Sequence, residues 1–125
     1  MSRAGPAAGD RAELAATVTE ADTAIALGSG DVAVLGTPRL IALCEAATVA
    51  ALAGTIDPAS TTVGVDVHME HLAASPVGAA VRAVAVVEES TGRSIAFAVE
   101  AFEGDRLIGR GRIVRAVVDR VRFPG

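Results

Sequence analysis

The stretch GTPRLIALCEAATVAALAG, residues 36–54, predicts one long helix and sets the architecture of the chain. Thr37 is a favourable N-cap, Pro38 suits the first helical turn and Gly54 is a natural stop. Apolar residues fall on every side of the helical wheel, so we expect the rest of the domain to surround this helix. Glu45 stands in the middle of it, and a carboxylate in such surroundings needs a cation, a hydrogen-bond donor or a chemical role.

Strand signals fill most of the remaining chain. Loose alternation predicts a first strand over residues 13–22, followed by a Gly-rich loop and a short apolar piece at residues 32–35. After the helix, β-branched runs separated by turn residues predict four further strands, over residues 61–68, 77–88, 94–103 and 107–121. The turns ESTGR and EGDR join the last three strands into an antiparallel meander.

These elements indicate an α+β domain in which one long central helix is wrapped by a curved, mostly antiparallel β-sheet, the hotdog fold. We predict a flexible N-terminal tail over residues 1–10 and a single hotdog domain over residues 11–125. The open edge of such a sheet and the apolar composition favour dimerisation edge to edge.

Composition excludes several classes of function. Of the 125 residues, 51% are hydrophobic and only three are aromatic, all phenylalanine. Because rings to stack on bases are scarce and the net charge is -4, we expect no nucleic-acid partner. The helix is too short to cross a bilayer, so no membrane association is expected. A single cysteine and an N-terminus without the apolar core of a signal peptide favour a cytoplasmic location.

Histidine, cysteine and arginine are the remaining candidates for chemistry. His68 and His71 are three positions apart on a predicted strand and therefore point to opposite faces, so we predict no metal site. His71 ends that strand before an Ala-Ala-Ser-Pro turn, a position typical of a residue displayed into a cleft. Cys44 is interpreted as a small buried hydrophobe. Arg110 and Arg112 share a strand face, where they either form a solvated edge or contact the phosphates of a nucleotide-like substrate.

Three segments together resemble a known family. TPRLIALCEAA (37–47), VGVDVHMEHLAASPVG (63–78) and GRGRIVRAVV (109–118) resemble the fluoroacetyl-CoA thioesterase-like family of hotdog proteins, in both order and separation. The resemblance implies a catalytic set of Thr37, Glu45 and His71. It also implies that Gly64 and Arg115 line the acyl pocket. The implied enzyme is a thioester hydrolase that acts on a small acyl-CoA, with coenzyme A as part of the substrate and no separate cofactor.

The resemblance also indicates a mechanism. Glu45 would attack the thioester carbonyl or activate water, and His71 would transfer protons. The helix N-terminus would stabilise the oxyanion through its N–H groups. The Thr37 hydroxyl would orient water or the carboxylate, unless it caps the helix instead. Hotdog sites usually lie between subunits, so a homodimer or a dimer of dimers is expected, in which His71 can serve the Glu45 of a second copy.

Two alternatives remain open from the sequence. One is a non-catalytic hotdog module that binds an acyl-CoA or another small apolar ligand, which the permissive, aromatic-free loop over residues 23–36 would suit. The other is a hydratase acting on enoyl thioesters, although the Asp/His arrangement usual for that reaction is not evident.

Overall fold

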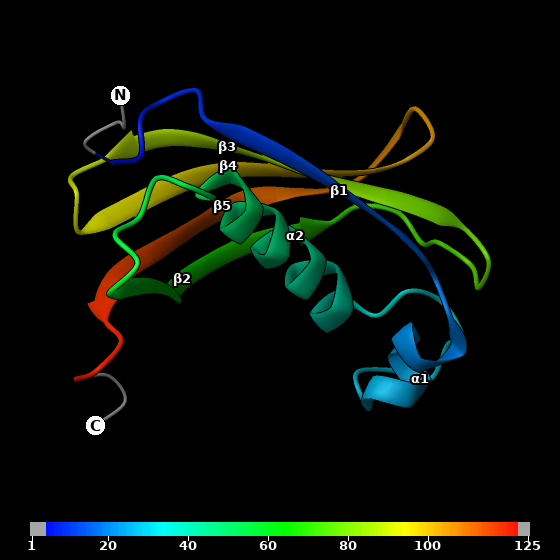
Figure 1. Cartoon of the computed structure of the whole chain (residues 1–125). Helices are drawn as coiled ribbons and strands as arrows, with labels where there is room; N and C mark the ends of the chain where they lie inside the picture. The colour runs from blue at the N-terminus through cyan, green and yellow to red at the C-terminus, as the bar shows by residue number, and fades with distance from the viewer. Residues whose placement is uncertain (1–4, 123–125) are drawn as a thin grey trace.

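The chain folds into one long helix that lies in the curve of a five-stranded antiparallel sheet (Figure 1). The computed structural model describes residues 5–122. The strands follow the order β1-β3-β4-β5-β2 across the sheet. The elements in chain order are β1 (Arg11–Thr17), η1 (Glu20–Asp22), α1 (Ala24–Leu27), α2 (Thr37–Ala51), β2 (Ser60–His71), β3 (Ala80–Ser90), β4 (Ser94–Glu103) and β5 (Arg106–Asp119). The predicted α+β arrangement is therefore confirmed.

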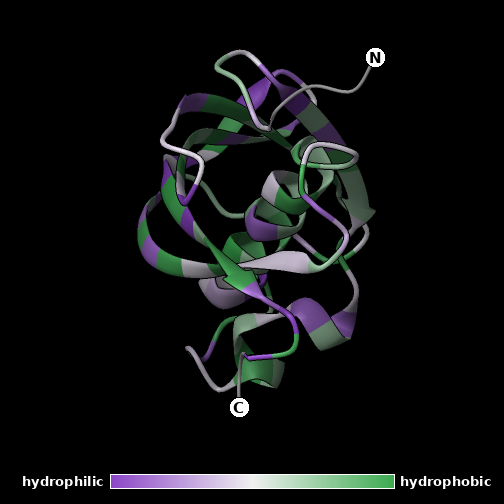
Figure 2. Ribbon diagram, turned by 60° about the vertical axis from the view of Figure 1, so that its left-hand side comes forward, coloured by the Kyte–Doolittle hydropathy of each residue, from purple (hydrophilic) through white to green (hydrophobic). Residues whose placement is uncertain are grey.

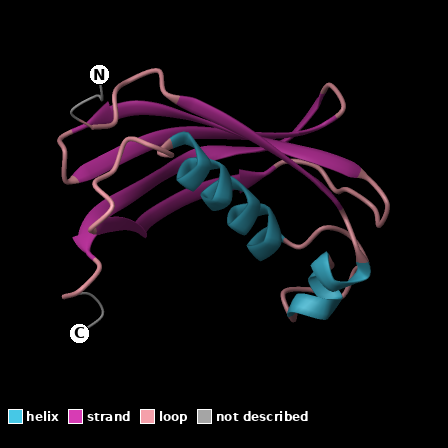
Figure 3. Cartoon of the chain, in the orientation of Figure 1, coloured by secondary structure: helices cyan, strands magenta, loops and turns pink. Residues whose placement is uncertain are grey.

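The last three strands form the predicted meander. Only Gly104 and Asp105 separate β4 from β5, and Gly104 takes the left-handed conformation (φ 61°) that such a tight turn requires. β2 does not join its neighbour in sequence. It pairs instead with β5, from Ser60 opposite Asp119 to His71 opposite Gly109. β2 is therefore a long strand at the edge of the sheet (Figure 3). Its last residue, His71, contacts Thr37 at the start of α2.

The core lies between α2 and the concave face of the sheet, and it is almost entirely aliphatic. Figure 2 shows the sheet curling around the helix. Phe97, Leu40 and Ile95 are the largest fully buried side chains. Cys44 is fully buried among them, which confirms its interpretation as a small hydrophobe. Burial raises the pKa of its thiol to about 12, so Cys44 is no nucleophile at neutral pH.

The structure corrects three predictions about the long helix. Gly36 is the N-cap and Thr37 is the first helical residue, so Thr37 does not cap the helix. The helix also ends at Ala51, before Gly54. Nor is it surrounded on all sides. Ala42, Ala46 and Val49 are exposed, because the sheet of one chain wraps only part of the helix circumference.

The first predicted strand is also shorter than expected. β1 ends at Thr17, and the chain then turns into η1 and α1. The side chain of Asp22 accepts hydrogen bonds from the Thr19 amide (2.8 Å) and hydroxyl (2.9 Å), and such local bonds compete with strand formation. The predicted apolar piece at residues 32–35 is not a strand. Isolated bridges, Thr23 with Leu35 and Val34 with Pro76, hold it in place.

A bulge in β2 changes which side chains face the helix. Gly64 lies opposite Arg115 and Val67 lies opposite Ile113, but the register shifts between Gly64 and Asp66. Gly64 and Val67 therefore share the inner face, although they are three residues apart and a regular strand would place them on opposite faces. The third predicted strand also starts later, at Ala80, because the chain turns at Gly78 (φ 93°).

Residues 1–4 of the predicted tail lie outside the described residues, whereas Gly9 donates a backbone hydrogen bond to Val87 (2.9 Å). Within residues 5–122, no helix is long and apolar enough to cross a membrane.

Candidate active site

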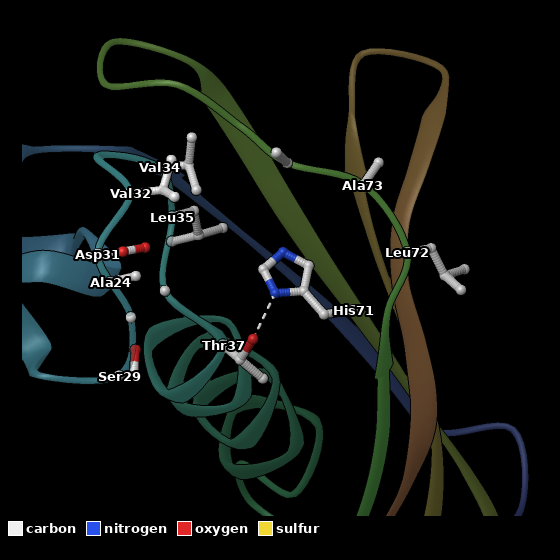
Figure 4. A pocket seen from close by; sticks show the side chains of 13 residues that line it. Ala24, Ser29, Asp31, Val32, Val34, Leu35, Thr37, His71, Leu72 and Ala73 are labelled. Atoms are coloured by element: carbon white, nitrogen blue, oxygen red, sulfur yellow. Dashed lines mark hydrogen bonds between the residues drawn. The ribbon is translucent and has the colours of Figure 1, made fainter.

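The first turn of α2 meets the end of β2 at a threonine–histidine pair. The Oγ1 atom of Thr37 lies 2.8 Å from the Nδ1 atom of His71, and Figure 4 shows the ring pointing at the hydroxyl. Because Gly36 serves as the N-cap, the hydroxyl of Thr37 is free to make this contact. The sequence left open whether that hydroxyl caps the helix or serves a site, and the geometry shows that it contacts His71 and does not cap the helix.

Burial controls the protonation of His71. The side chain is half-buried, and burial lowers the pKa of His71 below its ordinary 6.5, while the neighbouring backbone of Ala73 opposes the shift. The ring is therefore neutral at neutral pH, with one nitrogen that accepts a proton and one that donates. Its Nε2 atom is buried and has no hydrogen-bond partner within residues 5–122. A neutral histidine bonded to a hydroxyl can take up and return protons.

The turn after β2 that helps to form the site is anchored on both sides. Arg106 donates a hydrogen bond to the Ala74 carbonyl (2.7 Å) and pairs with Glu103 (2.7 Å). On the other side, the Leu35 amide donates to the Ser75 carbonyl (2.8 Å). These contacts tie the turn to the β4–β5 hairpin and to the segment before α2.

An open pocket of about 420 Å³ borders this pair. One wall comes from α1 and the segment before α2, and the other comes from the end of β2 and the turn after it (Figure 4). The apolar part of the lining consists of Ala24, Val32, Val34, Leu35, Leu72, Ala73 and Ala74. The sequence analysis connected this segment with ligand binding only in the non-catalytic alternative, as a permissive loop without aromatic residues.

The start of α2 offers a single free backbone donor. Pro38 has no N–H, and the amide of Arg39 already donates to the Gly36 carbonyl (3.0 Å). The amide of Thr37 has no protein partner in the described part of the chain. Like other N–H groups of a helix start, it is directed out of the N-terminus along the helix dipole, where partial negative charge is favoured.

A second polar cluster lies half-way along α2. Arg115 reaches across from β5 and contacts the Glu45 carboxylate (3.5 Å). Its guanidinium also donates to the hydroxyl (2.9 Å) and the carbonyl (3.0 Å) of Thr62. Burial lowers the pKa of Arg115, and the Glu45 carboxylate opposes this shift. Arg115 is thus the cation that the sequence analysis gave as one possible partner for Glu45.

Gly64 belongs to this second cluster. A Cβ atom at this position would lie 2.5 Å from the Oε2 atom of Glu45 and 3.5 Å from the Nη1 atom of Arg115. The missing side chain therefore leaves room for the carboxylate. Thr62, which holds Arg115, was missed by the sequence analysis, because this contact joins residues that are 53 positions apart in the chain.

The five predicted site residues thus form two separate clusters within one chain. Thr37 and Glu45 are eight residues apart on α2, which corresponds to about 12 Å along the helix axis. Thr37 and His71 meet at one position, and Glu45, Gly64 and Arg115 meet at the other. A single chain does not bring Glu45 to His71.

The other candidate residues face away from both clusters. His68 lies on the opposite face of β2 from His71 and approaches the carboxylate of Asp66 (3.4 Å). Arg110 pairs with Glu70 (3.1 Å), and Arg112 pairs with Glu88 (3.4 Å) and Glu89 (3.3 Å). These arginines therefore lie on a solvated face, each beside an acidic partner. No group of three or more His, Cys, Asp and Glu side chains that could hold a metal ion occurs between residues 5 and 122.

Comparisons with known proteins place these observations among relatives. A family model for fluoroacetyl-CoA-specific thioesterases matches residues 18–121. A fluoroacetyl-CoA thioesterase of Streptantibioticus cattleyicolor is 32% identical over 90 residues, which are 72% of this chain and 65% of that protein. The match therefore spans slightly less than two thirds of that relative's length.

Solved structures agree along nearly the whole chain. A crystal structure of a point mutant of the fluoroacetyl-CoA-specific thioesterase FlK has a TM-score of 0.89 at 28% identity, covering 97% of this chain and 94% of its own. A thioesterase superfamily member of Thermus thermophilus has a TM-score of 0.85 at 25% identity, covering 98% and 89%. A hot-dog-like protein of Thermanaerovibrio acidaminovorans shares the fold. Its TM-score is 0.83 at 19% identity, and the match covers 96% of this chain and 95% of that one. The predicted hotdog fold is confirmed.

Proposed function

The chain belongs to the family of fluoroacetyl-CoA-specific thioesterases, and from that premise we propose that it hydrolyses a small acyl-CoA thioester. Membership confirms the family that three sequence segments predicted. The observation that carries the proposal is the 2.8 Å contact between Thr37 and His71 at the edge of an open pocket. Coenzyme A enters as part of the substrate, and the proposed chemistry uses side chains and one backbone amide of the protein. The single buried thiol is compatible with a cytoplasmic location.

The proposed reaction places the thioester carbonyl at the start of α2. The oxygen of an attacking water bonds to the carbonyl carbon and gives its proton to a carboxylate, while the free amide of Thr37 stabilises the oxyanion. The carbon–sulfur bond then breaks, and the proton held by the carboxylate passes through the Thr37–His71 pair to the departing thiolate, which leaves as a thiol. This transfer restores the carboxylate and the neutral histidine. Direct attack by the carboxylate, followed by hydrolysis of the resulting anhydride, uses the same groups.

The carboxylate is that of Glu45 from a second copy of the chain. Within one chain, Glu45 is about 12 Å along the helix from Thr37, too far to share a substrate carbonyl. β2 offers an unpaired edge of twelve residues, on which Val65 is 59% exposed and Val67 is 37% exposed. Beside it, Val49 on the uncovered face of α2 is 52% exposed. A homodimer formed through this edge, alone or paired into a dimer of dimers, covers these apolar groups.

The dimer register follows from the positions of the two clusters. Two antiparallel copies of β2 related by a two-fold axis place residue i opposite residue j, and j opposite i. His71 meets the second copy's Glu45 if it lies opposite Gly64, the residue that contacts Glu45. Because the bulge adds one residue between Gly64 and Asp66, that register places the two-fold axis at His68.

Complementation between two inactive variants tests both the residues and their sharing. Glu45→Gln and His71→Ala should each abolish thiol release from a panel of short acyl-CoAs while leaving the dimer intact. When the two variants are coexpressed in equal amounts, half of the dimers contain one copy of each variant. In each of these mixed dimers, one of the two sites is intact. Activity should then recover to about a quarter of wild type. No recovery would refute the shared site, and turnover by Glu45→Gln alone would refute the role of Glu45.

A further inference from the structure

Arg115 is a buried cation whose position depends on a residue outside the five predicted site residues. Its side chain is only 9% exposed, and a guanidinium taken out of water needs acceptors for its N–H groups. Within residues 5–122, the acceptors belong to two residues, Thr62 on β2 and Glu45 on α2. The lengths of these contacts show which of the two holds the cation.

Thr62 makes the shorter contacts. The Nε atom of Arg115 donates to the Thr62 hydroxyl (2.9 Å), and the Nη2 atom donates to the Thr62 carbonyl (3.0 Å). Both are ordinary hydrogen-bond lengths, whereas the 3.5 Å between Nη1 and the Glu45 carboxylate is longer than a well-formed bond. Because the guanidinium is a rigid plane, two bonds to one residue fix its orientation, and Nη1 is left to face Glu45.

The register of β2 against β5 explains why this contact forms. Arg115 lies opposite Gly64, and Thr62 lies opposite Val117, so Thr62 and Arg115 are diagonal neighbours across the two strands. Gly64 has no side chain that could separate them. The bulge comes only after Gly64, so Thr62 keeps the regular alternation and faces the same side of the sheet as Gly64.

The Glu45 carboxylate has little else to hold it. It is 36% exposed, and in the described part of the chain Arg115 is its only hydrogen-bond or ion-pair partner. The direction of a flexible carboxylate with one long contact is set by its attraction to that cation. Any movement of the guanidinium would therefore move the carboxylate as well.

We propose that Thr62 is a positioning residue of the active site, whose hydroxyl holds the Arg115 guanidinium so that the Glu45 carboxylate stays in its reactive position. The inference rests on the proposed function, because it takes Glu45 as the group that acts on the thioester. Thr62 touches no reacting atom and acts only through Arg115.

Substitutions at Thr62 separate its hydroxyl from its shape. Thr62→Val keeps the shape and removes the hydroxyl, whereas Thr62→Ser keeps the hydroxyl and removes a methyl group. Thr61→Val is the matched control, because Thr61 is the preceding residue of β2, is also half-buried and makes no side-chain hydrogen bond with residues 5–122. Thr62→Ala removes the same hydroxyl and takes the place of Thr62→Val if that variant does not fold.

The first readout is the kinetics of thiol release from a short acyl-CoA. Thr62→Val should lower kcat about tenfold and change KM less than about twofold, because a displaced carboxylate slows the reaction while substrate binding does not involve Thr62. Thr62→Ser should restore kcat to within about threefold of wild type, and Thr61→Val should stay within the same range.

The second readout needs no activity. A buried and hydrogen-bonded N–H exchanges slowly with water, so nitrogen-15 NMR should show a protected Nε–H signal for Arg115, assigned by its absence in Arg115→Lys. Thr62→Val should speed the exchange of this proton at least about tenfold, because a hydrogen bond to a charged group is lost. Thr62→Ser and Thr61→Val should leave it protected.

Several results would overturn the inference. One is an unchanged kcat in Thr62→Val, and another is an equal loss in Thr61→Val. A loss of kcat that Thr62→Ser does not restore would assign the effect to packing rather than to the hydroxyl. A loss of kcat with the Nε–H proton still protected would show that Thr62 does not act through Arg115. Failure of wild type to hydrolyse any short acyl-CoA would instead refute the proposed function, and it is distinguishable because it requires no Thr62 variant.

Discussion

Substitution of Gly64 is the most direct test of whether the Glu45 carboxylate acts at the position that it has in the structure. An alanine Cβ would lie 2.5 Å from the Oε2 atom of Glu45, whereas ordinary contact begins near 3.4 Å. The substitution Gly64→Ala therefore displaces the carboxylate by roughly 0.9 Å. The contact of Arg115 with the carboxylate, now 3.5 Å, would be disturbed by the same movement.

We expect Gly64→Ala to lower activity and to leave the stability of the fold nearly unchanged. The clashing atom is the end of a flexible side chain that is 36% exposed, so it can rotate away, and alanine also restricts the unfolded chain. We expect the free energy of unfolding to change by less than about 1 kcal/mol, a shift in Tm of no more than about 6 °C. A catalytic group misplaced by about 1 Å can cost a factor of about 100 in rate. We therefore expect kcat to fall about 100-fold.

The assay is free-thiol release from the best neutral acyl-CoA, with thermal unfolding and size-exclusion chromatography on the same samples. Val63→Ala is the matched control, because it changes the neighbouring residue of the same edge strand on the opposite face. It should retain activity within about threefold of wild type. If Gly64→Ala also stays within that range, the Glu45 carboxylate does not act in its observed position. If both variants lose activity together, the cause is damage to β2.

Three further predictions concern pH, the segment before α2 and the core. Because the pKa of His71 lies below 6.5, kcat/KM should rise with pH below that value and stay level between about pH 7 and 8; a continued rise would exclude a neutral His71. Asp22→Asn should lower the free energy of unfolding at neutral pH by about 1 to 2 kcal/mol through its bonds to Thr19 and Arg39. Those bonds hold the pKa of Asp22 below 3.8. The difference between variant and wild type in the free energy of unfolding, measured with urea, should therefore shrink as pH falls below that value, and a constant difference would contradict this role of Asp22. Leu40→Ala, at a fully buried position, should cost about 2 to 5 kcal/mol, and a loss under about 1 kcal/mol would contradict the packing.

Local patterns predicted most of the fold because each element is specified by neighbours in sequence. The proline and the long apolar run predict the helix of residues 37–51. The β-branched residues and two short turns predict the strands of the meander. The boundaries were less well predicted. Residues 18–27 fold into short helical turns because Asp22 bonds back to Thr19, and such side-chain bonds compete with a strand that the apolar pattern alone suggests.

The sequence by itself determined the chemistry available to this protein: a threonine at a helix start, a carboxylate inside that helix, and a histidine before a tight turn. Only the tertiary structure decided how these groups are used. Gly36 became the N-cap because its backbone packs against Ala24 and Leu27, where a Cβ would approach to 2.9 Å, and this freed Thr37 for His71. The bulge in β2 turned Gly64 toward Glu45. Both outcomes depend on contacts between segments far apart in the chain, which no local pattern of residues contains.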